Sequence, residues 1–402
     1  MTSARSPFER LHTLLDGIDP GGPPVDLTVG GPRQPIPPFV ADVIAENAHL
    51  FGKYPPIGGT KDFRDTVHAW IDKRYSLSGA LTAHGGLLPL NGSREGLFFA
   101  AIVARDVLQK ENPAILLANP FYQTYLAAAH TVDAEPIALG AAPGVLQNFD
   151  ALDPTVLDRT IGIYIASPAN PEGDCASAAD WEHLFEAALR HNFFIFADEC
   201  YSEIYREGGP APIGALEAAA ARPEVMARLM VFNSLSKRSN LAGMRVGFVA
   251  GGHAPIEAMR AFRNQAAPQV PIPLQAAAAA TFRDEAHVIA NRRLYDEKFE
   301  DVDHILGPLF GAVVPPAGFF LWLPVRGNDV AITRSLWAEA GVKAVPGRYL
   351  AAPAFDGTNP GEGYVRFALV GSRDETKDAL KRMRGFFAAH ADLAGERQAA
   401  TA

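Results

Sequence analysis

The feature that most constrains the fold is a series of six short apolar runs separated by helical stretches. The runs cover residues 86–90, 114–118, 161–166, 193–197, 229–232 and 246–250. None of them alternates apolar and polar residues, which is typical of strands that are covered on both faces. Helical periodicity falls between them, at 95–107 and 178–191. The pattern predicts an α/β fold with a mainly parallel central sheet, and ligands of such sheets bind at the carboxyl ends of the strands.

The sequence also predicts how the chain is divided. Residues 1–45 are rich in proline and glycine and hold one strand-like piece, so we expect an N-terminal arm that packs against the small domain described next. Near residue 285 a long charged helix precedes a second, shorter set of strands and helices. We therefore expect a large domain over 46–285 and a smaller α/β domain over 286–402.

Composition narrows the class of function. The 402 residues carry a net charge of −9 without a lysine or arginine block, which argues against a nucleic-acid partner. No apolar run approaches the ~18 residues of a membrane span, and the N-terminus lacks the apolar segment of a secretory signal. The two cysteines, Cys175 and Cys200, cannot form a disulfide framework, so we expect a cytoplasmic protein with Cys200 as a small buried residue. No cysteine or histidine cluster has metal-ligand spacing, and no metal is expected.

Lys237 lies in a polar segment between two of the apolar runs. Ser234 and Ser236 precede it, and Arg245 follows eight residues later. Hydroxyl groups and a guanidinium suit a phosphate. A lysine beside a phosphate site can form a Schiff base with the aldehyde of a phosphorylated cofactor. This combination indicates pyridoxal phosphate, and the alternative is a surface lysine in a polar turn.

Two other strand ends carry polar groups that suit the same cofactor. Ser93 and Arg94 open a predicted helix directly after a strand, where free backbone N–H groups can hold a phosphate, although a serine cap is common there. Asp198 ends the apolar run 193–197, and a carboxylate in that position needs a partner. A protonated pyridine nitrogen would be such a partner, and a helix cap or a buried ion pair is the alternative.

Aromatic, amide and guanidinium groups complete the set of candidates. Tyr201 can bond the phenolic oxygen of the cofactor or only pack, and Tyr122 can stack on a flat ring or belong to the core. Asn170 is held in a turn between prolines, where its amide can donate to the ring oxygen and to a substrate carboxylate. Arg366 lies in a predicted strand and needs an anion, either a substrate α-carboxylate or an internal carboxylate.

These motifs occur in one chain order. They are Asn91-Gly92-Ser93, Asn119-Pro120-Phe121-Tyr122, Ser167-Pro168-Ala169-Asn170-Pro171, Asp198-Glu199-Cys200-Tyr201, Ser234-Leu235-Ser236-Lys237, Gly243-Met244-Arg245 and Arg366. Over nearly the whole chain, this order resembles the class I/II aminotransferases of the aspartate aminotransferase fold. The resemblance implies a pyridoxal phosphate-dependent transferase of fold type I, with a large domain and a smaller α/β domain.

The resemblance assigns the ring of the cofactor to five residues. It implies that Lys237 carries the cofactor and acts in catalysis, and that Asp198 pairs with the pyridine nitrogen. Tyr201 and Asn170 would bond the phenolic oxygen, and Tyr122 would stack on the ring.

The resemblance also implies how the phosphate and the substrate are bound. The phosphate ligands would be Ser93, Arg94, Ser234 and Arg245, with Ser236 as an addition. Tyr54 matches a family tyrosine that reaches the phosphate of the neighbouring subunit, which implies a homodimer. Arg366, with Asn170 and Gly30, would hold the substrate α-carboxylate. Arg33, in the arm beside Gly30, is the candidate for a distal carboxylate, and a solvated loop arginine is the alternative.

A narrower likeness concerns the substrate. Segments 119–125, 198–205, 234–240 and 345–350 look like proteobacterial succinyldiaminopimelate aminotransferases, which make the lysine precursor diaminopimelate with glutamate as amino donor. Glu172 and Gly31 depart from that family, which usually has threonine and an acidic residue at these positions. The alternatives are an aminotransferase for aspartate, aromatic or varied amino acids, a pyridoxal phosphate β-lyase, and a cofactor-binding regulatory domain. The last usually follows a DNA-binding helical module, for which the first 45 residues leave little room.

Overall fold

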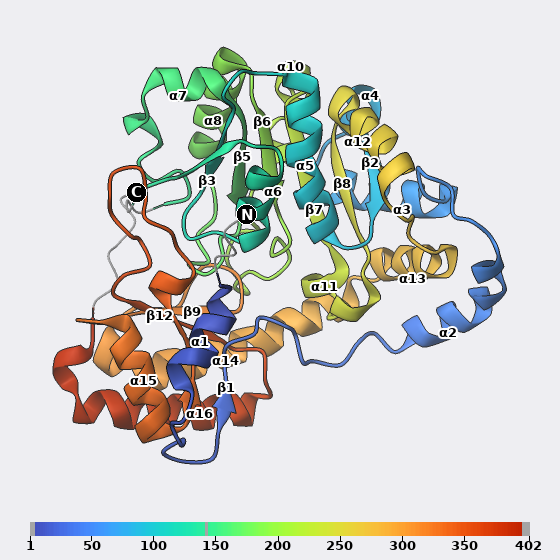
Figure 1. Cartoon of the computed structure of the whole chain (residues 1–402). Coiled ribbons are helices and arrows are strands. Elements are labelled where there is room, and N and C mark those ends of the chain that lie inside the picture. The colour runs from blue at the N-terminus through green and yellow to red at the C-terminus, as the bar shows by residue number, and fades with distance from the viewer. Residues whose placement is uncertain (1–4, 141–143, 396–402) are drawn as a thin grey trace.

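A seven-stranded sheet forms the centre of the larger part of the molecule (Figure 1). The structure is a computed structural model, and it describes residues 5–140 and 144–395. The strand order is β2-β8-β7-β6-β5-β3-β4. The strands are β2 (Gly85–Leu90), β3 (Ala114–Leu117), β4 (Glu135–Ala138), β5 (Thr160–Ala166), β6 (Phe194–Asp198), β7 (Leu229–Ser234) and β8 (Gly247–Gly252).

The expected α/β fold with a mainly parallel sheet is confirmed. Strands β7, β6, β5, β3 and β4 pair in parallel, and only β8 runs antiparallel to its two neighbours. All six predicted strands are present. The edge strand β4 was not predicted, since its four residues include a proline and begin with an exposed glutamate.

Helices cover both faces of this sheet, as the apolar strands require. One face packs against α5 (Ser93–Leu108), α6 (Gln123–Thr131) and α12 (His253–Ala266). The other face packs against α3 (Lys61–Tyr75), α8 (Ala178–His191) and α13 (Ile272–Arg283). Shorter helices connect these layers: α2 (Phe39–Asn47), α4 (Ala80–His84), α7 (Pro154–Arg159), α9 (Ala215–Ala218), α10 (Pro223–Met226) and α11 (Leu235–Arg238).

A second, smaller core surrounds a three-stranded antiparallel sheet. Its order is β11-β12-β9, with β9 at Phe320–Pro324, β11 at Val345–Pro346 and β12 at Tyr364–Ala368. Helices α14 (Ala286–Phe310), α15 (Asp329–Ala340) and α16 (Arg373–Ala389) pack around it. Helix α14 begins one residue after the boundary expected at 285, and the division into domains itself stays a prediction.

The N-terminal segment is more structured than an extended arm. It contains a helix, α1 (Pro7–Leu15), which the sequence analysis did not predict. Strand β1 (Val25–Asp26) then pairs in parallel with β10 (Val342–Lys343), and the N–H of Ala368 donates to the carbonyl of Leu27 at 2.7 Å. The segment therefore contacts the same elements that carry the smaller sheet.

Candidate active site

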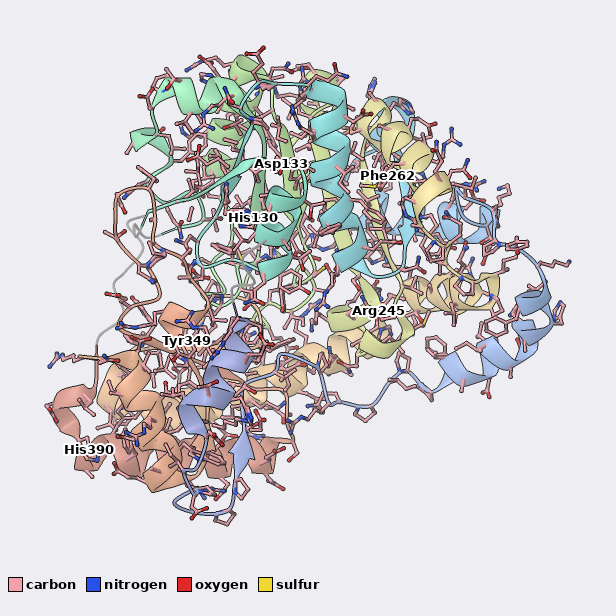
Figure 2. The ribbon with its side chains drawn as sticks, viewed as in Figure 1. His130, Asp133, Arg245, Phe262, Tyr349 and His390 are labelled. Atoms are coloured by element: carbon pink, nitrogen blue, oxygen red, sulfur yellow. The ribbon has the colours of Figure 1, made fainter. Side chains whose placement is uncertain are left out.

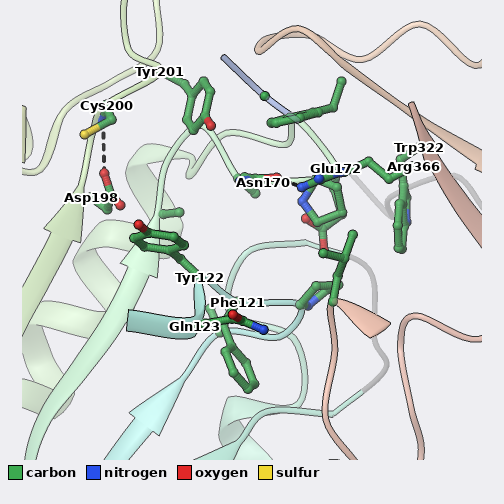
Figure 3. Close-up of a pocket in the computed structure, with 18 of the residues that line it drawn as sticks. Phe121, Tyr122, Gln123, Asn170, Glu172, Asp198, Cys200, Tyr201, Trp322 and Arg366 are labelled. Atoms are coloured by element: carbon green, nitrogen blue, oxygen red, sulfur yellow. Dashed lines mark hydrogen bonds between the residues drawn. The ribbon is translucent and has the colours of Figure 1, made fainter. Parts of the chain in front are cut away.

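A cavity of about 740 Å³ lies where the carboxyl ends of the central strands meet the smaller sheet. Its walls include residues that follow β3, β5, β6 and β7, together with residues of β9, β12 and the N-terminal segment. This is the place where α/β sheets bind ligands. Figure 3 shows Asp198 and Cys200 on one side of the cavity and Trp322 and Arg366 on the other.

Lys237 reaches the cavity from α11, the short helix that follows β7. Its Nζ donates to the carbonyl of Gly30. Burial lowers the pKa of Lys237 to about 8, because a buried ammonium loses its hydration. A larger share of its amine is therefore uncharged near neutral pH, which suits a nucleophile or a general base.

Asp198 is the last residue of β6 and is buried. Its carboxylate accepts hydrogen bonds from the hydroxyl of Tyr125 at 2.7 Å and from the N–H of Cys200 at 3.2 Å, the latter dashed in Figure 3. It forms no ion pair with any residue in the described part of the chain. A buried carboxylate without a counterion fits a protonated ring nitrogen.

The beginning of α5 is built to receive an anion. The helix starts at Ser93, after Gly92 with φ +80°. A Cβ at Gly92 would lie 2.2 Å from Nη2 of Arg245, so only glycine allows this guanidinium to approach. Arg245 is exposed beside α11 (Figure 2), donates to the carbonyl of Ala242 at 3.0 Å, and pairs with no carboxylate among residues 5–140 and 144–395. Free N–H groups, a hydroxyl and a free cation together suit a phosphate.

The two predicted serines occupy different positions. Ser236 lies on the cavity wall, whereas Ser234 is fully buried behind it and donates to the Oγ of Ser236 at 2.8 Å. Cys200 also lines the cavity, and its thiol donates to the Oγ of Ser93 at 3.1 Å. Burial raises the pKa of the Cys200 thiol, so it stays neutral, as expected for a small buried residue.

Tyr122 and Tyr201 both line the cavity (Figure 3). Nε of Arg94, another wall residue, donates to the hydroxyl of Tyr122. Tyr201 packs edge-on against Phe319 and Phe320, and its burial raises the pKa of its phenol. Both side chains therefore place an aromatic ring where a planar ligand can be bound.

Arg366 is a buried cation with unused hydrogen-bonding capacity. It extends from β12, donates to the carbonyl of Thr28 at 2.7 Å and to the Oδ1 of Asn170 at 3.3 Å, and its Nε has no partner. Its guanidinium carbon lies 4.5 Å from the ring centroid of Phe320. Burial lowers the pKa of Arg366 to about 10. Within the described residues it pairs with no carboxylate, so the internal salt bridge considered above is absent and an external anion fits.

Only some of the candidate residues in the N-terminal part of the chain line the cavity. Gly30 and Gly31 line it, and a Cβ at Gly30 would lie 2.4 Å from Cζ of Phe320, so the close approach requires glycine. Arg33 lies outside the lining, because its guanidinium pairs with Glu375 at 3.2 Å. The structure therefore does not support a role for Arg33 in binding the distal carboxylate of a substrate in this cavity. Tyr54 is fully exposed and lies outside the lining as well, whereas Glu172 is part of it.

Some contacts of the site were missed at the sequence level. Tyr125 stands one helical turn after Tyr122, which is the only signal that it lies on the same side of α6. Its bond to Asp198 spans 73 residues, and the bond from Arg366 to the Thr28 carbonyl spans 338.

Among the described residues, no three histidine, cysteine, aspartate or glutamate side chains are grouped to hold a metal ion. The same residues include no helix with both the length and the apolar character of a membrane crossing.

Comparison with known proteins gives this site its chemical context. Residues 23–383 match the family model described as aminotransferase class I and II. The crystal structure of an aminotransferase from Neisseria meningitidis is 36% identical, with a TM-score of 0.88 over 96% of this chain and 98% of that one. That of aminotransferase AspB from Helicobacter pylori is 29% identical, with a TM-score of 0.85 over 96% and 99%. An LL-diaminopimelate aminotransferase from Dehalococcoides mccartyi is 26% identical over 90% of this chain and 91% of its own length.

The cavity fits the cofactor that enzymes of this fold use. A half-buried lysine with a lowered pKa, a buried carboxylate without a counterion among the described residues and an anion site at a helix N-terminus lie around one space. These are the groups that pyridoxal phosphate needs for its aldehyde, its ring nitrogen and its phosphate. The chain belongs to the class I and II aminotransferases and is a pyridoxal phosphate-dependent enzyme.

Proposed function

We propose that the enzyme transfers an amino group between glutamate/2-oxoglutarate and N-succinyl-LL-2,6-diaminopimelate. The observation that carries the proposal is Arg366, a buried guanidinium that, among the described residues, pairs with no carboxylate and has an Nε without a partner. Both substrates present an α-carboxylate, and a planar guanidinium binds a carboxylate through two parallel hydrogen bonds. Asn170, whose Oδ1 is bonded to Arg366, would place its amide beside the same carboxylate.

Different residues around the cavity would bind different parts of the cofactor. Lys237 would hold its aldehyde carbon, Asp198 its ring nitrogen, and Tyr201 with Asn170 its phenolic oxygen. Tyr122 would lie against the ring. The phosphate ligands would be Ser93, Arg94, Ser234, Ser236 and Arg245, of which Ser234 would act through Ser236, to which it is hydrogen bonded. When bound, pyridoxal phosphate supplies an aldehyde for the substrate amine and a ring that accepts the electron pair released at Cα.

The protein groups then have separate tasks. Arg366 fixes the α-carboxylate and so orients the Cα–H bond. Lys237, with its lowered pKa, would remove the Cα proton and deliver it to the carbon that was the aldehyde carbon of the cofactor, which completes the transfer. Asp198 keeps the ring nitrogen protonated through its charge, and Tyr125 and the Cys200 N–H hold that carboxylate in one orientation.

Other observations support the pathway and the assembly. Several relatives that cover about nine-tenths of the chain are named LL-diaminopimelate aminotransferases. Tyr54 is fully exposed on this chain and distant from its own cavity lining, which suits a residue that completes the site of a second subunit. The proposal therefore includes a cytoplasmic homodimer in which Tyr54 reaches the partner's phosphate site.

The test is a panel of amino donors followed by the absorbance change of the cofactor in single half-reactions. Glutamate and N-succinyl-LL-2,6-diaminopimelate should convert the cofactor to its aminated form, and alanine and phenylalanine should do so far more slowly. Efficient turnover of phenylalanine with none of the succinylated substrate would contradict the pathway and leave the aminotransferase class. Release of ammonia and a 2-oxo acid without 2-oxoglutarate would instead indicate a β-lyase.

A further inference from the structure

The cavity has charged groups at its floor, and its solvent-facing lining includes apolar side chains beside charged ones such as Arg94 and Glu362. Arg366 at the floor is buried and Lys237 is half-buried, whereas the lining residue Phe8 is 44% exposed. Phe121 and Leu350, also part of the lining, are half-buried. We call Phe8, Phe121 and Leu350 the apolar rim. A substrate whose amino and carboxylate groups bind at the floor must extend the rest of its chain toward this rim.

Phe8 is held at the rim by a firmly anchored helix. Helix α1 buries Leu11 and Leu15 against Val345, and the guanidinium of Arg10 lies 3.8 Å from the ring centroid of Tyr349. Figure 2 labels Tyr349 beside this helix. A capping box formed by Ser6 and Glu9 fixes the N-terminal end of the helix. That end is directed toward the larger sheet in Figure 1.

The residue on which α1 packs also lies beside Arg366, the candidate carboxylate ligand. Val345, which packs on α1, is the register partner of Arg366 in the β11–β12 pair. On the opposite side, the N–H of Phe121 donates to the carbonyl of Leu350 at 3.3 Å and joins the two walls of the rim. The helix that carries Phe8 is therefore packed on the strand that pairs with the Arg366 strand, and the Phe8 ring keeps 44% of its surface exposed.

We propose that Phe8 is a specificity-determining residue, which contacts the carbon chain of the substrate and favours amino acids with long unbranched chains over short ones. The inference deepens the proposed function, and it rests on that function only in requiring an amino-acid substrate that extends to the rim. It needs neither the succinyl group nor the distal carboxylate. It can therefore hold if the pathway assignment fails.

The test uses a series of linear amino acids: alanine, 2-aminobutyrate, norvaline, norleucine and 2-aminoheptanoate. Burial of one methylene changes affinity by roughly fourfold, so kcat/KM should rise by about that factor for each carbon that contacts the rim. With two such carbons, Phe8→Ala should lower the ratio of kcat/KM for 2-aminoheptanoate to that for alanine by about sixteenfold. Phe8→Leu, which keeps an apolar side chain, should restore most of the ratio.

The control is Leu14→Ala, which removes apolar volume from the same helix at a half-buried position outside the cavity lining. It should leave the ratio at its wild-type value. A binding measurement provides a second readout: inhibition constants of unbranched carboxylic acids from propionate to heptanoate should lose their chain-length dependence in Phe8→Ala. The proposal is overturned if Phe8→Ala lowers kcat/KM for alanine and for 2-aminoheptanoate by equal factors. It is also overturned if Leu14→Ala lowers the ratio of the two kcat/KM values as much as Phe8→Ala does.

Discussion

Replacing Arg366 by lysine keeps the positive charge in the cavity but removes the planar fork. In the structure, Nη1 and Nη2 of Arg366 are already directed by Asn170 and the carbonyl of Thr28, and Nε is buried without a partner. A lysine ammonium at this position would satisfy the carbonyl or the carboxylate at one point only. The substitution therefore tests whether the fork, and not only the charge, binds the substrate.

The magnitude follows from the bonds that are lost. A hydrogen bond to a charged group contributes about 1.5–3 kcal/mol, and one of the two parallel bonds to a carboxylate disappears in Arg366→Lys. This corresponds to roughly a ten- to hundredfold weaker apparent affinity. Because the α-carboxylate is common to all substrates, the loss should be similar for amino donors and 2-oxo acid acceptors.

The assay is the concentration dependence of the half-reaction, measured separately with glutamate and with 2-oxoglutarate. Arg206→Lys is the control, since Arg206 is a half-buried arginine that pairs with Asp296 at 3.2 Å and lies outside the cavity lining. It should lower the free energy of unfolding without changing either apparent affinity. A change below about threefold for both ligands in Arg366→Lys, or a change for one ligand only, would refute the assignment of the α-carboxylate to Arg366.

Three further predictions concern the same cavity. Because burial lowers the pKa of Lys237 to about 8, its amine loses its proton as the pH rises through that value, so cofactor capture by cofactor-free protein should speed up between pH 7 and 9 and then level off. Stopped-flow absorbance measures this rate, and a rate that still rises steeply from pH 9 to 10.5 would mean an ordinary lysine. Asp198→Asn keeps the shape but loses the charge, so with saturating pyridoxal phosphate the removal of the Cα proton should slow on the order of a hundredfold, and near wild-type turnover of α-deuterated glutamate would speak against the role. Arg33→Ala breaks the pair with Glu375 outside the cavity, so it should change kcat/KM for glutamate and alanine by equal factors, whereas a selective loss for glutamate would return Arg33 to the site.

The parts of the fold that the sequence predicted are those in which local pattern and burial agree. The strands of the central sheet are apolar on both faces, so their runs were visible without tertiary information. Helix α1 was missed because nine residues with two buried leucines are too short to signal a helix alone, and its stability comes from packing on Val345 and Tyr349.

The candidate site residues also differ in whether the local sequence or only a distant contact indicates them. Asp198 and Arg366 could be predicted because each is a charged residue in an apolar strand, a conflict that only a ligand or a partner resolves, and Lys237 could be predicted because serines and an arginine surround it. Arg33 could not be judged, since its partner Glu375 lies 342 residues away and nothing in either local sequence indicates the pair. Phe8 gave no signal either, because a single aromatic residue on a short segment is compatible with any surface.

The pairing of the two ends of the chain has a consequence for synthesis. The carbonyl of Thr28 and the guanidinium of Arg366 are 338 residues apart. Strand β1 likewise cannot pair until β10, near the other end of the sequence, has been synthesised. At a translation rate of about 5–20 residues per second, the N-terminal segment leaves the ribosome roughly 17–70 seconds before its partners do. During that interval the cofactor-binding strands from β2 to β8 can already form their sheet, while Val25 and Leu27 remain without their cover. The strands that carry the candidate cofactor residues can therefore form before Arg366 meets the N-terminal segment, and the side chains of Val25 and Leu27 are the apolar surface that a chaperone would need to protect.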